Sequence, residues 1–169
     1  MTDSLVIMGV AGCGKSSLGA AVAQATGLAL VEGDDFHSPA SRAKMSQGIA
    51  LTDADRDGWL GVLGDQLRGH PEGLVLTCSA LKLSYRERLR QAAPGLRFVF
   101  LDISREEAQA RVAARAAEHF FSTTLVDSQF ATLENPTGEP GVLRVDALKS
   151  LAQLQAEVTT WLGASKEQA

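Results

Sequence analysis

The sequence predicts a three-layer α/β fold built on a mostly parallel β-sheet. Short, continuously apolar segments alternate along the chain with segments of helical periodicity, and this alternation is typical of a parallel sheet covered by helices. The apolar segments do not alternate with polar residues, as expected for strands that are buried on both faces. A chain of 169 residues with 45% hydrophobic residues suits one domain. We expect this domain to span residues 1–164, followed by a frayed tail at 165–169.

Five strands and several helices are expected in chain order. The predicted strands are Leu5–Met8, Leu28–Val31, Leu74–Cys78, Phe98–Leu101 and Val142–Val145. Two apolar stripes at helical spacing predict helices, and they run along Leu60, Leu63 and Leu67, and along Leu148, Leu151, Leu154, Val158 and Trp161. Capping boxes predict two helix starts, at Ser84 with Glu87 and at Ser104 with Glu107; Thr52 with Asp55 is a weaker variant.

Composition excludes several classes of function. The net charge of −4 argues against a nucleic-acid surface, which needs a basic face. No apolar run reaches the roughly 20 residues that span a bilayer, and no basic segment of a secretory signal precedes the first apolar stretch. Two cysteines form neither a disulfide framework nor a zinc motif, which favours a reduced, cytoplasmic setting. An anionic substrate would have to be held by a local cluster of positive charge.

The strongest motif follows the first predicted strand. Gly9-Val-Ala-Gly-Cys-Gly-Lys15-Ser16 matches the phosphate-loop pattern G-x-x-x-x-G-K-[ST]. Glycines let the backbone amides of such a loop surround the phosphates, the lysine reaches the β- and γ-phosphates, and the serine hydroxyl binds Mg²⁺. The motif therefore predicts binding of ATP and Mg²⁺, with the metal on Ser16. The nucleotide-binding residues are expected to be Gly9, Gly12, Cys13, Gly14, Lys15, Ser16 and Ser17. Cys13 occupies a variable position, where a small filler residue is a simpler interpretation than a redox role.

Carboxylates follow the second predicted strand, in Gly33-Asp-Asp-Phe-His37. Ligands of open α/β sheets bind outside the carboxyl ends of the strands, so Asp34 is a candidate to accept the proton of an acceptor hydroxyl or to hold a metal-bound water. The alternative is that Asp34 and Asp35 only cap the helix near Ser38. His37 either binds the substrate or fixes the turn.

Two groups of basic residues each have two possible roles. Arg56 begins a predicted helix, and Lys82 and Arg86 follow the third strand; they either bind an anionic substrate or form solvated surface. Arg111, Arg115 and His119 recur every four residues and would share one helix face. That face either neutralises the transferred phosphoryl group, as arginines do in phosphotransferases, or is an exposed surface with a Glu107–Arg111 pair.

Several segments together resemble the small P-loop gluconokinases, over residues of roughly 5 to 146. Besides the phosphate loop and Gly33–His37, the matching segments are Lys44-Met45, Gly48, Leu51–Arg56, Trp59-Leu60, Cys78–Lys82, Tyr85-Arg86, Leu89-Arg90, Arg111, Arg115, His119-Phe120, Ser128–Phe130 and Leu133-Glu134. The most distinctive are Cys-Ser-Ala-Leu-Lys and the set His-Phe, Ser-Gln-Phe and Leu-Glu. One departure is Ser38, which separates His37 from Pro39 where the family usually has His-Pro.

The resemblance implies transfer of the γ-phosphoryl group of ATP to the 6-hydroxyl of D-gluconate, giving 6-phosphogluconate. It also implies a fold similar to shikimate and nucleoside-monophosphate kinases, with a five-stranded parallel sheet, a mobile lid at about 111–125, and a homodimer. The catalytic residues it implies are Lys15, Asp34, Arg111 and Arg115. The substrate-binding residues are Asp34, His37, Arg56, Lys82, Arg86 and His119. Arg56, Lys82 or Arg86 would hold the gluconate carboxylate.

Two other functions are compatible with parts of the pattern. A kinase for a related acid such as shikimate would share the phosphate loop, Asp34 and the lid arginines. A nucleotide-binding regulator without catalysis would be expected to lack Lys15, Ser16, the acceptor carboxylate or the lid arginines, and all of these are present.

Overall fold

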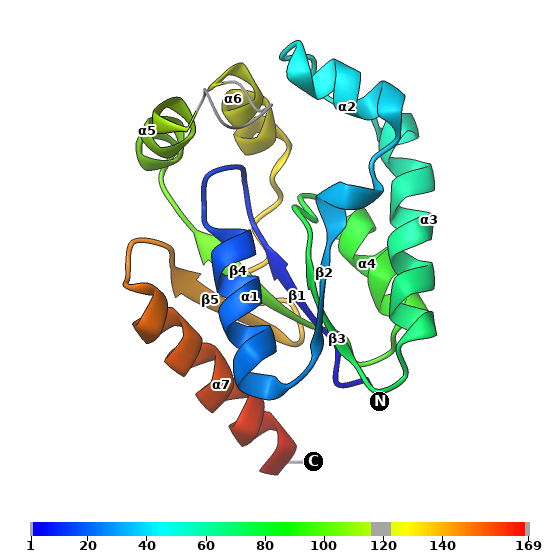
Figure 1. The fold of residues 1–169 in the computed structure, drawn as a ribbon, viewed down its shortest axis with the longest axis vertical. Coiled ribbons are helices and arrows are strands. Elements are labelled where there is room, and N and C mark those ends of the chain that lie inside the picture. The colour runs from blue at the N-terminus through cyan, green and yellow to red at the C-terminus, as the bar shows by residue number, and fades with distance from the viewer. Residues whose placement is uncertain (1, 116–122, 168–169) are drawn as a thin grey trace.

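A computed structural model of the chain, which describes residues 2–115 and 123–167, contains a five-stranded, all-parallel sheet (Figure 1). Its strands are β1 (Leu5–Met8), β2 (Ala29–Glu32), β3 (Leu74–Thr77), β4 (Arg97–Asp102) and β5 (Val142–Asp146), in the order β2-β3-β1-β4-β5. The five predicted strands are confirmed, and no strand end differs by more than one residue. Leu5 of β1 pairs with Val75 of β3 on one side and with Arg97 of β4 on the other.

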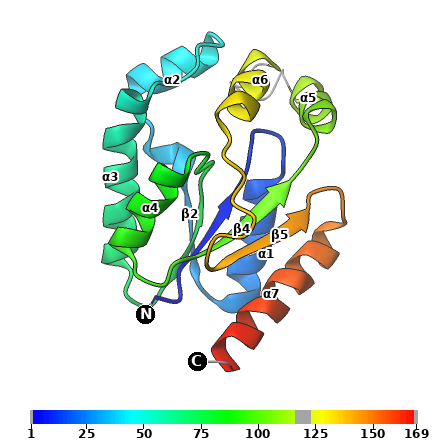
Figure 2. The same cartoon turned by 180° about the vertical axis from the view of Figure 1, so that it is seen from behind.

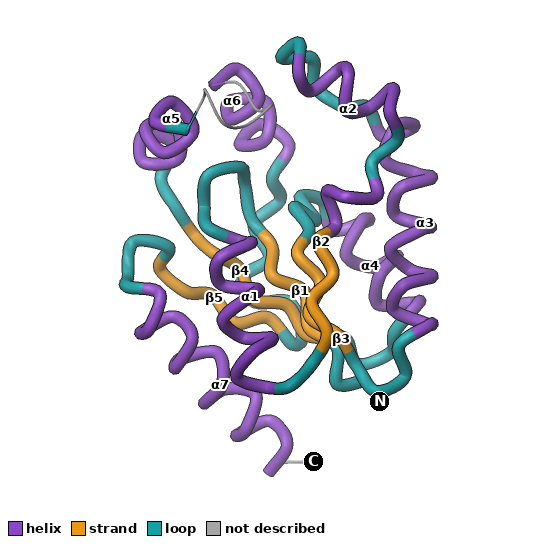
Figure 3. Tube along the Cα trace, in the orientation of Figure 1, coloured by secondary structure: helices purple, strands orange, loops and turns teal. Residues whose placement is uncertain are grey.

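Helices cover both faces of the sheet and make it the middle of three layers (Figure 3). On one face α1 (Lys15–Thr26) packs against α7 (Leu151–Glu167), and on the other α3 (Asp53–Gly69) packs against α4 (Leu83–Ala92). Successive side chains of β1 point to opposite faces: Leu5 and Ile7 join the core of α1 and α7, and Val6 and Met8 that of α3 and α4. The prediction of a three-layer α/β fold is confirmed.

Burial differs between the central and the outer strands. All residues of β1 and β3 are buried, whereas β2 is partly or largely exposed, with Leu30 at 37% exposure. The prediction that all five strands are covered on both faces is therefore wrong at the edges, because β2 and β5 each have one neighbouring strand and incomplete helical cover. The predicted stripe on α7 is also shorter than expected: Leu154 and Val158 are buried, but Leu148 and Leu151 are about half exposed.

Helix ends agree only in part with the sequence. Thr52 begins α3 with a full capping box, in which its hydroxyl accepts from Asp55 N and Asp55 accepts from Thr52 N. Ser104 caps α5 (Arg105–Ala114) through Glu107 N. The capping box predicted at Ser84 is wrong: α4 begins at Leu83. The last helix, α7, ends at Glu167, and the domain bounds of 1–164 and the frayed tail stay predictions.

The remaining elements stand above the carboxyl edge of the sheet. They are the 3₁₀ helix η1 (Gly33–Phe36), α2 (Pro39–Ser46), α5 and α6 (Thr123–Thr132). Figures 1 and 2 show α5 and α6 on one side of this edge and α2 on the other, with the loop after β1 between them. No helix of the described residues is long and apolar enough to span a membrane.

Candidate active site

The phosphate loop connects β1 to α1 in a conformation that needs its glycines. Gly9, Gly12 and Gly14 all have positive φ angles, of 148°, 83° and 97°, which other residues rarely adopt. A Cβ on Gly9 would lie 2.7 Å from Cys13 Sγ, and a Cβ on Gly12 would lie 2.9 Å from the carbonyl oxygen of Ala108 on α5. The loop is therefore closely packed against its own cysteine and against α5.

Cys13 fills space beneath the loop. Its side chain is buried, and burial raises the pKa of the thiol, although the nearby charges of Lys15 and Arg111 oppose that shift. A protonated, buried thiol fits the interpretation of a filler residue. Cys78 is likewise a core residue, and burial raises its pKa to about 12.

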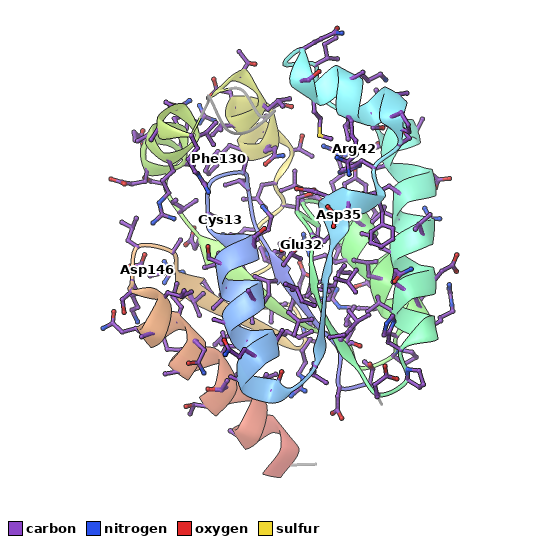
Figure 4. All side chains as sticks on the ribbon, in the orientation of Figure 1. Cys13, Glu32, Asp35, Arg42, Phe130 and Asp146 are labelled. Carbon is purple, nitrogen blue, oxygen red and sulfur yellow. The ribbon has the colours of Figure 1, made fainter. Side chains whose placement is uncertain are left out.

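Lys15 lies against the start of the loop. Its Nζ donates to the carbonyl oxygens of Gly9 and Val10, each at 3.0 Å. The following residue, Ser16, donates its hydroxyl to Glu32 Oε2 at 3.0 Å. Thr77, at the end of β3, donates to the same carboxylate oxygen. Figure 4 shows Glu32 and Cys13 at the same end of the sheet.

The sequence interpretation missed Glu32. It is the last residue of β2 and lies one position beyond the predicted strand Leu28–Val31, although a carboxylate at the carboxyl end of a strand is itself a signal for a site. Mg²⁺ binds hard oxygen ligands through one or two protein groups together with substrate phosphates. The hydroxyl of Ser16 beside the carboxylate of Glu32 fits such a site.

Asp34 is presented on η1 by contacts of its neighbours. Gly33 lies so close to β3 that a Cβ would be 2.3 Å from the carbonyl oxygen of Thr77, and its own carbonyl accepts from Trp59 Nε1 at 2.8 Å. The Asp34 carboxylate is 3.5 Å from His37 Nε2 and about half exposed. Burial raises the pKa of this carboxyl, but the hydrogen bond with His37 and the charges of Lys15 and Arg42 outweigh it, so the pKa is lowered.

The alternative role for Asp34, as a helix cap, is wrong. Ser38 caps α2: its hydroxyl accepts from Ser41 N at 3.1 Å, and Pro39 occupies the first turn. The serine that separates His37 from Pro39 therefore has a structural explanation. The carboxylate of Asp34 is left available for other partners.

Two cavities meet at Lys15 and Asp34, and both residues line both of them. The first, here the loop cavity, is also lined by Ala11, Gly12, Gly14, Ser16, Ser17, Val112 and Arg115. The second, here the distal cavity, lies toward α2, α3 and α6. It is also lined by His37, Met45, Ala50, Leu51, Arg56, Ser79, Leu125, Ser128 and Gln129. An ammonium and a carboxylate thus lie at the junction of two cavities.

His37 and Arg56 bring polar groups to the distal cavity. The His37 ring is buried and stacks on Trp59 with centroids 4.3 Å apart. Its Nδ1 is buried without a partner among the described residues. Arg56 is buried, and its Nη1 donates to Leu51 O at 3.1 Å and to Tyr85 Oη at 3.4 Å.

The structure separates Lys82 and Arg86 from this cavity. Lys82 donates to both carboxylate oxygens of Asp53, at 2.9 and 3.1 Å, and does not line the cavity. Arg86 is fully buried, and its guanidinium binds Glu139 and the carbonyl oxygens of Ala80 and Glu134. The prediction that Arg86 binds substrate is corrected, since a side chain with no exposed surface and with its donors occupied holds the fold together.

The two lid arginines have different positions. Arg111 donates to the carbonyl oxygens of Gly12 at 3.2 Å and Ala147 at 3.1 Å, so it joins the phosphate loop to the segment after β5. Arg115 is the C-cap residue that follows α5; it is exposed and lines the loop cavity. Both line a third cavity beside the loop, with Ala147, Leu151 and Leu154 among its walls. His119 and the rest of residues 116–122 of the predicted lid lie outside the described residues.

Three further polar residues of the distal cavity were not singled out from the sequence as site residues: Ser79, Ser128 and Gln129. A signal for them was present, because they belong to the two most distinctive segments, Cys78–Lys82 and Ser128–Phe130. Gln129 is noteworthy for its position, because its Oε1 accepts a hydrogen bond of 2.6 Å from the loop amide of Ala11.

Comparisons with known proteins agree with this geometry. A family model described as an AAA domain matches residues 5–136. A gluconokinase of Gluconobacter oxydans is 46% identical over 150 residues, which cover 86% of this chain and 83% of that protein. The thermosensitive gluconokinase of Escherichia coli is 38% identical over 156 residues, which cover 90% of this chain and 83% of that protein.

A solved structure extends the likeness to three dimensions. The crystal structure of a gluconokinase from Sinorhizobium meliloti superposes with a TM-score of 0.90 at 44% sequence identity, covering 98% of this chain and 94% of that one. Similarity at this level over nearly the whole length includes both the phosphate loop and the walls of the distal cavity. The chain belongs to the gluconokinase family.

Proposed function

We propose that the chain transfers the γ-phosphoryl group of ATP to the 6-hydroxyl of D-gluconate, giving 6-phosphogluconate and ADP. The observation that carries this proposal is the shared lining of the two cavities by Lys15 and Asp34. A phosphotransferase needs a place where a phosphate chain and an acceptor hydroxyl meet in line. The gluconokinase relatives support gluconate as the acceptor.

The loop cavity is the proposed triphosphate site. The amides of Gly12–Ser16 and the N-terminus of α1 favour an anion there, and Lys15 would exchange its carbonyl partners for the β- and γ-phosphates. Ser16, supported by Glu32, would hold Mg²⁺, which when bound neutralises charge on the phosphates. The third cavity, beside Arg111 and Leu151, is the proposed site of the nucleoside.

The distal cavity is the proposed gluconate site. Apart from Lys15, the fixed cation among its described lining residues is Arg56, which we propose holds the gluconate carboxylate. A buried polar atom without a partner is costly, so the Nδ1 of His37 is a suitable partner for a sugar hydroxyl. Lys82 is left as a residue that positions Asp53 near Arg56 rather than a direct ligand.

The proposed reaction is a direct displacement. The 6-hydroxyl oxygen of gluconate attacks the γ-phosphorus, the bond from that phosphorus to the β–γ bridging oxygen breaks, and the hydroxyl proton passes to the Asp34 carboxylate. Because the transition state of such transfers is loose, orientation of the hydroxyl matters more than the strength of the base. In this proposal Arg115, which lines the loop cavity, neutralises the transferred group, whereas Arg111 holds the loop. The homodimer, the mobile lid at 111–125 and the part of His119 in it stay predictions.

A comparison of acceptors tests the proposal. ATP consumption is measured with D-gluconate, with shikimate and without an acceptor. We expect consumption with gluconate alone. Consumption with shikimate instead would reassign the acceptor, and equal slow loss of ATP in all three mixtures would favour a nucleotide-binding regulator.

A further inference from the structure

Gln129 is a side chain of the distal cavity that also contacts the phosphate loop. It lies on α6, 118 residues from Ala11, whose amide donates to Gln129 Oε1 at 2.6 Å. Ala11 lines the loop cavity, and Gln129 lines the distal cavity. One neutral amide therefore bridges the two proposed binding sites.

The face of α6 that carries Gln129 is fixed against the cavity. Leu125, Ser128 and Gln129 are three and four residues apart and share one helical face, and all three line the cavity. Leu125 packs with Met45 of α2 and with Leu51 in a small apolar cluster across the cavity. Gln129 is consequently held between this cluster and the phosphate loop.

The hydrogen bond from Ala11 determines which way the Gln129 amide points. A backbone N–H is only a donor, so the atom that receives it must be the carbonyl oxygen Oε1 and the NH₂ group must lie on the opposite branch. Within residues 2–115 and 123–167, no group accepts from Gln129 Nε2. Two N–H donors thus remain for a ligand in the distal cavity.

We propose that Gln129 is a positioning and specificity-determining residue for the acceptor. Its carbonyl oxygen orients the Ala11 amide of the phosphate loop, and its NH₂ group donates to an oxygen of the sugar acid beside the γ-phosphate. The proposal rests on the proposed function, because it needs a hydroxyl-rich anion in the distal cavity. It also explains why an amide suits this position: a carboxylate would still accept from Ala11 but would repel both the phosphate and the acid.

Two substitutions separate these roles. Gln129→Glu keeps an acceptor for the Ala11 amide, removes the donor and adds negative charge. Gln129→Met keeps the approximate volume of the side chain and removes both hydrogen bonds. Gln109→Ala is the matched control: Gln109 donates to Asp127 of α6 at 2.7 Å on the exposed surface and lines neither cavity.

Steady-state kinetics with ATP and gluconate test the proposal, with the melting temperature of each variant recorded. We expect KM for gluconate to rise about 10-fold or more in Gln129→Met and further in Gln129→Glu, as for loss of a hydrogen bond to a charged ligand. KM for ATP should rise less than KM for gluconate in Gln129→Glu, because this variant retains the loop contact although its charge repels the γ-phosphate. Gln109→Ala should resemble the wild type.

Other outcomes have distinct meanings. If the wild type turns over gluconate and both Gln129 variants keep its KM for gluconate while melting at lower temperature, Gln129 is only structural and the inference is wrong. If Gln129→Glu binds gluconate as well as the wild type does, the donor role is wrong. If the wild type does not phosphorylate gluconate, the proposed function fails, and the inference fails with it.

Discussion

At the junction of the two cavities, close neighbours restrict both the type and the position of single residues. Gly33 must be a glycine because β3 approaches it closely, and Trp59 holds its carbonyl. Asp34, which follows, is therefore presented to both cavities rather than to the core. Its lowered pKa keeps the carboxylate ionised at neutral pH, with His37 and Lys15 as the charge-stabilising partners.

Replacing this carboxylate tests its role in transfer. We expect Asp34→Asn to lower kcat by about 10²–10⁴-fold, because the acceptor hydroxyl loses its proton acceptor and orienting group. The affinity for ATP should be unchanged, measured by titration of a non-hydrolysable ATP analogue. Asp35→Asn, a change at the exposed neighbour, is the control. A kcat of Asp34→Asn near that of the wild type would show that Asp34 is not the acceptor carboxylate.

The pH dependence of kcat in the wild type and in Asp34→Asn follows from the direction in which the pKa of Asp34 is shifted. A carboxyl whose folded pKa lies below its ordinary value of 3.8 is ionised above that value and loses its charge only as the pH falls through the lowered pKa. The ratio of wild-type kcat to Asp34→Asn kcat should therefore stay constant from pH 8 to pH 5. A ratio that already falls between pH 7 and pH 6 would mean that the Asp34 pKa is raised, not lowered.

Replacing Arg56 tests its proposed role in binding the gluconate carboxylate. We expect Arg56→Met to raise KM for gluconate by about 10- to 100-fold through loss of a charge-assisted hydrogen bond to the carboxylate, with a smaller change in KM for ATP. Arg88→Met, which removes a partly exposed arginine paired with Asp57, controls for loss of charge. Unchanged binding of gluconate in Arg56→Met would show that Arg56 does not hold the gluconate carboxylate.

The positions of residues could be predicted from the sequence where a motif fixes the backbone, but not where burial in the tertiary structure determines which groups a side chain contacts. The loop residues and Asp34 lie where the pattern implied. Arg56 and Arg86 appear alike in sequence, as basic residues near helix starts, but Arg56 lines the distal cavity and Arg86 is enclosed in the fold. That distinction depends on Glu139, which lies 53 residues from Arg86 and accepts hydrogen bonds from Nε and Nη2 of its guanidinium.

Among the secondary-structure elements, α4 is tied to the segment before β5 by this buried pair. Arg86 of α4 binds Glu139 through two hydrogen bonds, of 3.0 and 2.6 Å, and also holds the carbonyl of Ala80 at 2.7 Å. Ala80 has a φ of 46° and is the one non-glycine residue with positive φ among the described residues. The contact therefore stabilises an unfavourable backbone next to Ser79 of the distal cavity.

Removing one partner of the pair should cost far more stability than removing a surface pair. We expect Arg86→Met to lower the free energy of unfolding by about 3–5 kcal/mol, because partly buried Glu139 keeps only Arg90 as a cation and the carbonyl oxygens of Ala80 and Glu134 lose their donor. Urea unfolding measures this change. Arg68→Met, which breaks an exposed pair with Asp65, should cost less than about 1 kcal/mol. Equal losses in the two variants would contradict the structural role given to Arg86.

Element existence was easier to predict than element ends. Apolar runs predicted all five strands, since the central ones are buried on both faces and need no polar positions. The start of α4 was misplaced because its cap comes from outside the local sequence: Glu134 Oε1 accepts from Leu83 N at 2.8 Å. A local pattern such as Ser84 with Glu87 therefore fails to predict the start of a helix whose first amide binds a carboxylate that is distant in the sequence.

At the level of the whole molecule, strand order assembles the site. The order β2-β3-β1-β4-β5 places the ends of β2 and β3 beside β1, so that Glu32, Thr77 and the loop before Ser16 converge. On the other side, α5 packs on the loop at Gly12 and α6 reaches it through Gln129. The sequence predicts the sheet and the loop, but the meeting of two cavities at Lys15 and Asp34 is a property of the assembled fold alone.

The central claim is that the two cavities are the two halves of one phosphotransfer site. Phosphorus NMR of the wild-type protein with ATP, Mg²⁺ and D-gluconate tests it most directly, because it identifies the product as well as the loss of ATP. We expect ADP and a phosphomonoester, coupled to the protons on carbon 6 of gluconate, to appear in equal amounts. Inorganic phosphate in place of the ester, or ATP that remains intact, would contradict the claim.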